Sequence, residues 1–265
     1  MSDDLRPVKL RDFLSALNVP DLDQLPLIHT TESSRIFSIL NQGKLKATPC
    51  NVFKGEDLCY FFVGRPAYKA KLAEPNPYYW QLPMVFVVKF HTALQSKRIF
   101  PFDSGAFANS KLPSHILSFD IADYDLAPNS ALVTKLISTF YGSNTNYFNA
   151  VGVKPEDLEM RHVLTPMHLQ ILSLAQMYAQ PRTIDSDDRK STIELQIEGD
   201  VEIEGGDLLG VILPEEFKRA PEIVAKLNSF GCQIEYYPFY PLRSDHFYYA
   251  IYDSVAKVLK ANGHI

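Results

Sequence analysis

A histidine followed by two hydroxyl side chains ends the first apolar segment of the chain. Residues 28–31 read Ile-His-Thr-Thr, and free backbone groups at a strand end can hold a flat ligand amide. A single histidine in this position is more often structural than ligand-binding. His29, with Thr30 and Thr31 beside it, is therefore a candidate binding residue to be weighed against an ordinary place in the fold.

An arginine follows a run of aromatic residues between positions 60 and 68. Gly64 permits a close backbone approach, and Arg65 would lie at the rim of the sheet, where a guanidinium can bind phosphate oxygens. The alternative is that Arg65 pairs with a carboxylate at a sheet edge.

A third segment alternates polar and apolar side chains in the manner of a half-buried strand. Within residues 191–197, Thr192, Glu194 and Gln196 share one face, and the other face is apolar. We expect the polar face to lie in solvent or in a cleft. Glu194 is the isolated carboxylate on that face.

A fourth segment, residues 98–107, is rich in aromatic side chains and contains Asp-Ser-Gly, a common turn sequence. If this turn lines a cleft, Asp103 and Ser104 would meet the substrate and Phe107 would cover it. The alternative is an ordinary surface turn.

A sheet with helices packed on it must position these segments. The N-terminal part predicts a helix over residues 9–17, a strand over 25–29, and a helix that is capped by Ser33 or Ser34 and stopped at Gly43. Apolar runs and alternation predict further strands over residues 58–63, 84–90, 192–197, 208–213 and 233–237. Helical spacing predicts helices over residues 131–140, 167–178, 215–230 and 246–259, and residues 182–190 read as a loop.

Composition and missing motifs exclude several classes of protein. The 265 residues, 46% of them hydrophobic, can bury a sizeable core, and no stretch approaches the roughly 20 apolar residues of a membrane helix. The three cysteines form no Cys-x-x-Cys pair and are too few for a disulfide framework, so we expect a cytoplasmic protein. Metal-binding histidine spacings, the Gly-x-Ser-x-Gly elbow and the glycine-rich nucleotide loops do not occur, so we expect no metal.

Charge is unevenly distributed along the chain. The net charge of −5 argues weakly against a surface dominated by nucleic-acid binding. Residues 35–71 nevertheless hold seven basic and two acidic side chains and could bind phosphates, whereas residues 185–207 hold nine acidic and two basic ones. Ordinary solvated surface is the alternative for both stretches.

The order of these segments resembles the ADP-ribosyltransferase fold, most closely the DarT-type nucleic-acid ADP-ribosyltransferases. The resemblance lies in His29-Thr30-Thr31 with residues 36–45, in residues 60–68, and in residues 192–214. Two features depart from the pattern: the run from Arg65 to Tyr68 is short, and Glu194 lacks the second acid of the Glu-x-Glu found in enzymes that modify arginine.

What the resemblance implies is cleavage of NAD, as substrate, with ADP-ribose passing to an acceptor. Glu194 would be the catalytic carboxylate, because a fixed carboxylate stabilises oxocarbenium charge and accepts the proton of the nucleophile. Arg65 would contact the phosphates or ribose, and the nicotinamide side would be held by His29 and Thr31. The residues expected to line the NAD site are His29, Thr30, Thr31, Tyr60, Phe62, Gly64, Tyr68, Asp103, Ser104 and Phe107. Tyr60, Phe62 and Tyr68 would stack on nicotinamide, although aromatic residues of strands more often belong to the core.

The expected architecture is a single α+β domain over residues 1–265, with an ADP-ribosyltransferase-like split central β-sheet, a helical insertion at about 108–182 and flanking terminal helices. The acceptor stays open between nucleic acid and protein, and an antitoxin or immunity protein would be a partner if the chain is a toxin or defence effector. Two alternatives remain: an NAD glycohydrolase, and a non-catalytic module that binds NAD, ADP-ribose or a nucleic-acid end.

Overall fold

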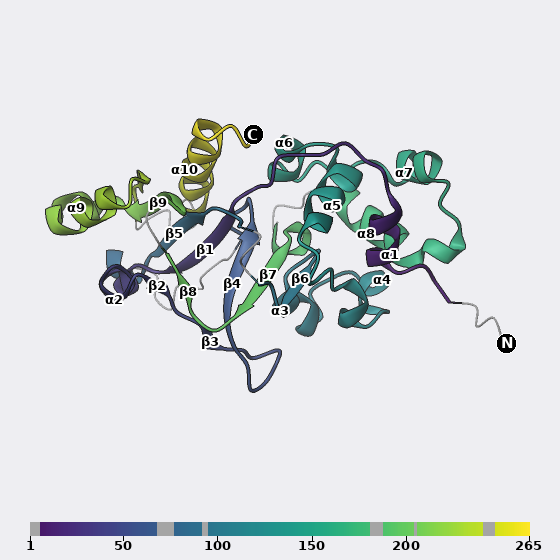
Figure 1. Cartoon of the computed structure of the whole chain (residues 1–265), viewed down its shortest axis with the longest axis horizontal. Coiled ribbons are helices and arrows are strands. Elements are labelled where there is room, and N and C mark those ends of the chain that lie inside the picture. Colours follow the sequence, from purple (N-terminus) through teal and green to yellow (C-terminus); the bar gives the residue numbers. More distant parts are fainter. Residues whose placement is uncertain (1–5, 68–76, 92–94, 181–187, 204–205, 241–246) are drawn as a thin grey trace. The chain divides into compact units, whose positions relative to one another are not determined.

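The computed structural model describes residues 6–67, 77–91, 95–180, 188–203, 206–240 and 247–265 (Figure 1). The chain divides into two compact units: a helical unit, Met1–Gln24 with Gln95–Leu195, and a sheet unit, Leu25–Leu94 with Gln196–Ile265. The predicted α+β class is confirmed, with helices and a mostly antiparallel sheet. The single domain and the boundaries of the insertion stay predictions.

The sheet unit is built around strands in the order β10-β9-β5-β1-β4, with β3 paired to β4. The strands are β1 (Leu27–Glu32), β3 (Thr48–Pro49), β4 (Asp57–Val63), β5 (Pro83–Val88), β9 (Leu208–Pro214) and β10 (Gln233–Tyr237). The β9–β10 pair is parallel, and the other pairs are antiparallel. Every residue of β5 is buried, which explains why this strand reads as an uninterrupted apolar run.

The helix after β1 begins differently from the sequence prediction. A 3₁₀ turn, η1 (Ser33–Arg35), precedes α2 (Ile36–Gln42), and neither serine caps the helix. The Ser34 hydroxyl instead donates to the Glu32 carboxylate at 2.5 Å, and no described residue offers the Ser33 hydroxyl a hydrogen bond. The predicted stop is confirmed, because Gly43 adopts a left-handed φ of 64°.

The helix predicted over residues 215–230 is divided in two. The structure has a 3₁₀ helix, η6 (Glu215–Arg219), and then α9 (Pro221–Ser229). The break falls at Ala220, because a residue before proline is disfavoured in the helical conformation. The C-terminal helix α10 (Phe247–Ala261) packs on β9, where Gly210 leaves room for Val258.

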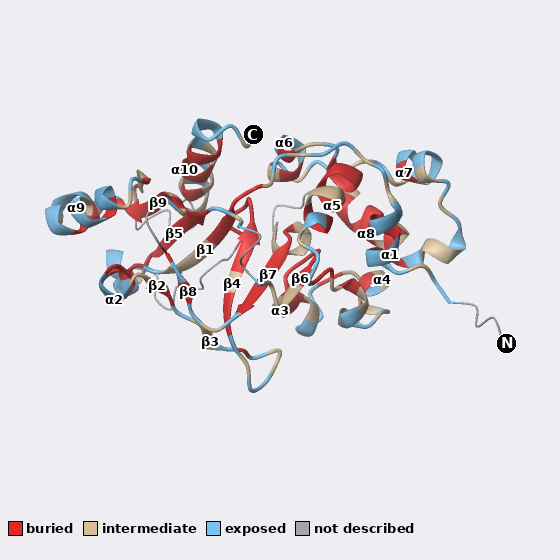
Figure 2. Ribbon diagram, viewed as in Figure 1, coloured by how far each residue is buried: buried red, intermediate tan, exposed pale blue. Residues whose placement is uncertain are grey.

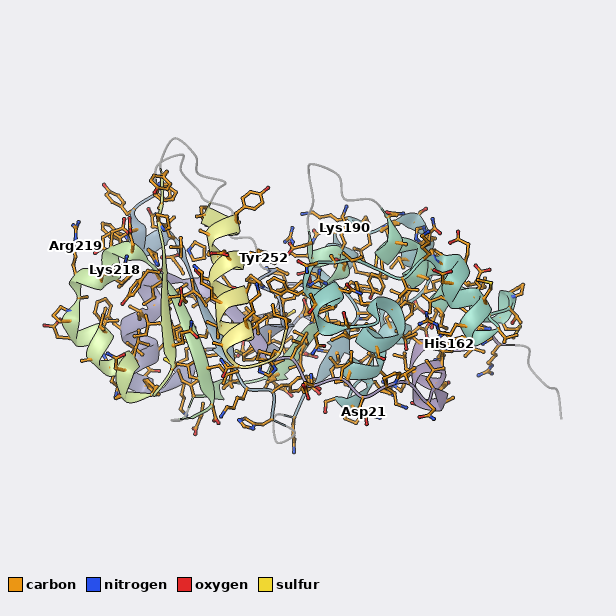
Figure 3. The ribbon with its side chains drawn as sticks, turned by 90° about the horizontal axis from the view of Figure 1, so that it is seen from above. Asp21, His162, Lys190, Lys218, Arg219 and Tyr252 are labelled. Carbon is orange, nitrogen blue, oxygen red and sulfur yellow. The ribbon has the colours of Figure 1, made fainter. Side chains whose placement is uncertain are left out.

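The helical unit contains the helices predicted over residues 131–140 and 167–178, together with the N-terminal helix. Its helices are α1 (Leu10–Ala16), α3 (Ser104–Ala108), α4 (Ser114–Leu117), α5 (Ala131–Tyr141), α6 (Asn144–Phe148), α7 (Pro155–His162) and α8 (Leu169–Ala179), with 3₁₀ turns η3 (Ile121–Tyr124), η4 (Pro166–His168) and η5 (Asp188–Ser191). The ring of Phe13 in α1 lies 5.7 Å from that of His162 in α7, the residue labelled in Figure 3. A second contact joins the Leu10 amide to Gln170 of α8 at 3.0 Å, so α1 is anchored at two places.

Several short strands escaped the sequence analysis. They are β2 (Lys44–Leu45) and β8 (Val201–Glu202), which pair with each other in the sheet unit, and β6 (Arg98–Phe100) in the helical unit. Two or three residues are too few to show a period in sequence. The 3₁₀ helix η2 (Tyr79–Gln81) precedes β5. No helix within the described ranges is both long and apolar enough to cross a membrane.

The strand that carries the candidate carboxylate, β7 (Glu194–Glu198), passes from the helical unit to the sheet unit between Leu195 and Gln196. The expectation that this polar face could lie in solvent is wrong, since Thr192, Glu194 and Gln196 are all buried. Figure 2 shows β7 coloured mostly as buried. Alternation identifies which side chains share a face, but it does not show what covers that face.

Candidate functional site

His29 lies in the middle of β1, where its ring is tied to the neighbouring strand. Its Nδ1 lies 2.9 Å from the backbone oxygen of Tyr60. Because a carbonyl only accepts, Nδ1 carries the hydrogen and Nε2 of the neutral ring is left as an acceptor. Burial lowers the pKa of His29 to about 4; the Tyr60 carbonyl opposes that change and the charge of Arg35 adds to it. The imidazole is therefore neutral at physiological pH.

A cavity of about 270 Å³ opens beside His29 within the sheet unit. The residues that line it are His29, Thr31, Arg35, Ser38, Ile39 and Lys46. Arg35 is exposed and makes no hydrogen bond or ion pair with any other described residue, whereas Lys46 pairs with Asp200 at 2.8 Å. Two cationic side chains and a neutral imidazole with a lone pair are groups that can bind an anionic, hydroxyl-bearing ligand.

The sequence analysis missed four of the lining residues: Arg35, Ser38, Ile39 and Lys46. Two signals could have found the three polar ones. Arg35 and Ser38 are three positions apart and so share one side of the helix that follows β1. Arg35 and Lys46 also belong to the basic stretch over residues 35–71. Of this stretch, the sequence analysis proposed only Arg65 as a residue that contacts phosphate.

The register of β1 and β4 decides which aromatic ring lies near His29. Leu27 pairs with Val63 and Ile28 with Phe62, so the next position sets Phe61 beside His29, and the two rings are 5.5 Å apart. Tyr60 and Phe62 point to the opposite face, since neighbouring side chains of a strand alternate.

The other residues predicted near His29 follow the same alternation. Thr30 also lies on the opposite face, and its Oγ1 is buried without a hydrogen bond to a described residue. The expected contact of Tyr60, Phe62 and Thr30 with the ligand is therefore not supported by their placement; Tyr60 acts through its carbonyl. Cys59 shares the face of His29, but burial raises the pKa of this thiol to about 12 and keeps it protonated.

Gly64 and Arg65 form the turn that ends β4. Gly64 has φ of 63°, its amide donates to the Pro26 carbonyl at 2.8 Å, and a Cβ there would lie 2.7 Å from the Leu25 side chain. The close approach is thus to the protein's own chain. Arg65 follows Gly64 at the end of β4 and is 1% exposed. Its predicted contact with phosphate or ribose stays a prediction. Tyr68 lies outside the described residues.

Glu194 accepts two hydrogen bonds from Ser104, a serine of the helical unit. Its Oε1 accepts from the Ser104 hydroxyl at 2.7 Å, and its Oε2 accepts from the Ser104 amide at 3.3 Å. Both residues are at least 98% buried. The serine expected to meet the substrate therefore contacts the candidate catalytic carboxylate instead.

The Asp-Ser-Gly sequence begins a helix and is not a surface turn. Asp103 is the N-cap of α3, with its carboxylate accepting from the Ala106 amide. Phe107, expected to cover the substrate, is half-buried and stacks on Phe102 at 5.6 Å. Both side chains have structural partners within the helical unit.

The structure thus brings the candidate residues together in two groups. His29 and Thr31 line one cavity of the sheet unit, and Glu194, Ser104 and Asp103 gather at the start of α3 in the helical unit. The convergence of the two groups on one groove stays a prediction. Within the described ranges, no three His, Cys, Asp or Glu side chains form a cluster that could hold a metal ion.

The low pKa of His29 predicts a pH-dependent stability. The unfolded chain binds a proton at His29 near pH 6.5, but the folded chain binds it only near pH 4, so stability falls as the pH drops through this window. The full shift would correspond to roughly 3 kcal/mol, and because the residue is only partly buried we expect about 1–2 kcal/mol. Urea unfolding at pH 7 and pH 5 should show a smaller difference for His29→Gln than for wild type; an equal difference would contradict this assignment.

Comparisons with known proteins show a distant structural likeness and no match in sequence. No protein-family model matches the chain, and no curated protein matches it. Among solved structures, the chain is similar to the DarT of Thermus sp. 2.9 in complex with NAD+, with 10% sequence identity, 83% of this chain and 98% of that chain covered, and a TM-score of 0.37. A superposition this loose does not transfer a function, so any functional assignment rests on the residues of this chain.

Proposed function

We propose that the protein is an NAD-dependent ADP-ribosyltransferase that breaks the bond between nicotinamide and ribose and passes ADP-ribose to a macromolecular acceptor. The observation that carries the proposal is the cavity beside His29, with its neutral imidazole, two hydroxyls and two cationic side chains. Its volume of about 270 Å³ is close to the lower end of the roughly 300–1,000 Å³ of small-molecule sites, so it would take part of a dinucleotide.

The cavity residues would bind NAD through complementary charge. Arg35 and Lys46 would hold the diphosphate, and Arg35 has no described partner from which it would have to be withdrawn. Nε2 of His29 would accept a hydrogen bond from a ribose hydroxyl or from the nicotinamide amide, because Nδ1 is already committed to Tyr60. The hydroxyl of Thr31 lies on the same face of β1 and would add a further polar contact.

Glu194 would perform the chemical step. As the glycosidic bond breaks, its electron pair moves to the pyridinium nitrogen and neutralises it, and positive charge develops on the ribose. A carboxylate held in a water-poor site stabilises that charge, then accepts the proton of the acceptor as the new bond to ribose forms. Ser104 donates to both oxygens of Glu194, which would hold the carboxylate in one orientation during this step.

A non-catalytic binding module is the second candidate, and a specific observation favours it. Glu194 is 2% exposed and bonded to Ser104, as expected of a structural carboxylate. The cavity could then bind NAD or ADP-ribose without turnover.

Incubation with NAD separates these functions. For the transferase we expect free nicotinamide by chromatography and radiolabelled ADP-ribose on added DNA, RNA or protein. Nicotinamide without label on any acceptor would indicate a glycohydrolase. Binding by calorimetry without nicotinamide release would indicate the module, and the absence of both binding and release would overturn the proposal.

A further inference from the structure

Ser104 and the tyrosines of α5 and α6 surround the segment that leads into β7. We infer that Ser104 is a positioning residue for Glu194, and that contacts within the helical unit fix the backbone segment that carries this carboxylate. The inference rests on the proposed function, because it assigns Glu194 a reaction whose geometry must be held.

Ser104 is well suited to fix the direction of a carboxylate. Its hydroxyl and its amide donate to different oxygens of Glu194, so the carboxyl plane is held at both ends. Ser104 is 1% exposed, and hydrogen bonds to a charged group are stronger where water is excluded. A carboxyl group that accepted only one hydrogen bond could still rotate, whereas two hydrogen bonds to different oxygens prevent that rotation.

The backbone of Ser104 is itself anchored. The Asp103 carboxylate caps the Ala106 amide, which defines the first turn of α3. The Asp103 amide donates to the Arg189 carbonyl at 3.0 Å, so the start of α3 is tied to the chain shortly before β7. The donor and the carboxylate are therefore held by one connected group of contacts.

Two tyrosine hydroxyls hold the residues just before Glu194. Tyr147 of α6 accepts from the Ile193 amide at 3.0 Å, and Tyr141 of α5 donates to the Ser191 carbonyl at 3.1 Å. Their rings meet edge to face at 5.1 Å, and both are 1% exposed or less. This gives the helical unit a task in the reaction that the sequence analysis did not identify: it supports the backbone of the candidate catalytic residue.

The test is a kinetic comparison of wild type with Ser104→Ala. Loss of one hydrogen bond to a charged group is expected to lower kcat for nicotinamide release about 10–100-fold. KM for NAD should stay within about twofold, because Ser104 does not line the cavity. Ser104→Thr keeps a hydroxyl and should recover most of kcat. Ser138→Ala removes the hydroxyl of another buried serine in the same unit and should leave kcat unchanged.

A second pair of variants keeps the inference testable if Ser104→Ala does not fold. Tyr147→Phe removes the acceptor of the Ile193 amide and should lower kcat with an unchanged KM. Tyr124→Phe is the matched control, because the Tyr124 hydroxyl is also buried but donates to a backbone group outside the segment before Glu194, the Ile116 carbonyl. Wild-type kcat in Ser104→Ala or in Tyr147→Phe overturns the inference alone. Failure of the wild type to release nicotinamide overturns the proposed function and the inference together.

Discussion

Glu194→Gln is expected to slow nicotinamide release by roughly 10²–10⁴-fold, the range found when a group that transfers protons and stabilises charge is removed. The amide keeps the shape of the side chain, and its oxygen can still accept from the Ser104 hydroxyl, so the fold should survive. What is lost is the negative charge that would face the developing oxocarbenium ion. The measurement is single-turnover release of nicotinamide from saturating NAD, with the melting temperature recorded for the same sample.

The matched control is Glu198→Gln at the far end of the same strand. Glu198 is exposed and loses the same charge, so its activity should equal that of wild type. Near-full activity in Glu194→Gln would show that the catalytic carboxylate is misassigned. NAD binding by Glu194→Gln should remain, because Glu194 does not line the cavity.

The long elements could be predicted because their signals are local. The face of α5 that Leu132, Val133 and Leu136 share repeats with the helical period, and the apolar run of β5 reflects burial on both faces. The short pairing of β2 with β8 joins residues more than 150 positions apart, and nothing in either two-residue segment indicates its partner.

The candidate site was predicted only in part. The sequence shows which side chains of one strand share a face, but it does not show how that strand aligns with its neighbour. Strand alternation in residues 60–68 made Tyr60 and Phe62 as plausible as Phe61 for contact with His29. The register of β1 against β4 selects Phe61, and that register depends on the turn at Gly64 and on the whole sheet.

Residues that act through other residues are also invisible in sequence. Asp-Ser-Gly reads as a turn, yet the same Asp caps a helix and the same Ser reaches a carboxylate 90 positions later. The role of a hydrogen-bond donor can be assigned only when the position of its acceptor is known. The contact of Ser104 with Glu194 could not be predicted without tertiary information, since a serine hydroxyl can bond a substrate or a carboxylate equally well.

The Arg35→Gln/Lys46→Gln double variant is expected to weaken NAD binding about 10–100-fold. Each cation would donate a charge-assisted hydrogen bond to the diphosphate, and the glutamines keep polar side chains without the charge. Stability should change little, because Arg35 is exposed and the Lys46–Asp200 pair is also largely exposed. The measurement is calorimetric titration with NAD at low and at high salt; wild-type binding should weaken with salt more than binding by the variant.

Lys44→Gln provides the control for a general change of charge. Lys44 begins β2, and Lys46 directly follows that strand. Lys44 carries the same charge as Lys46, but it pairs with Glu202 at 2.9 Å and does not line the cavity. The NAD affinity of Lys44→Gln should therefore remain within about twofold of wild type, since water and salt screen the interaction between a ligand and a charge outside the site. If Lys44→Gln weakens NAD binding as much as the double variant, then affinity depends on the overall charge of the surface, and the cavity beside His29 is not the binding site. If the double variant binds NAD as tightly as wild type, the diphosphate is held elsewhere in the chain.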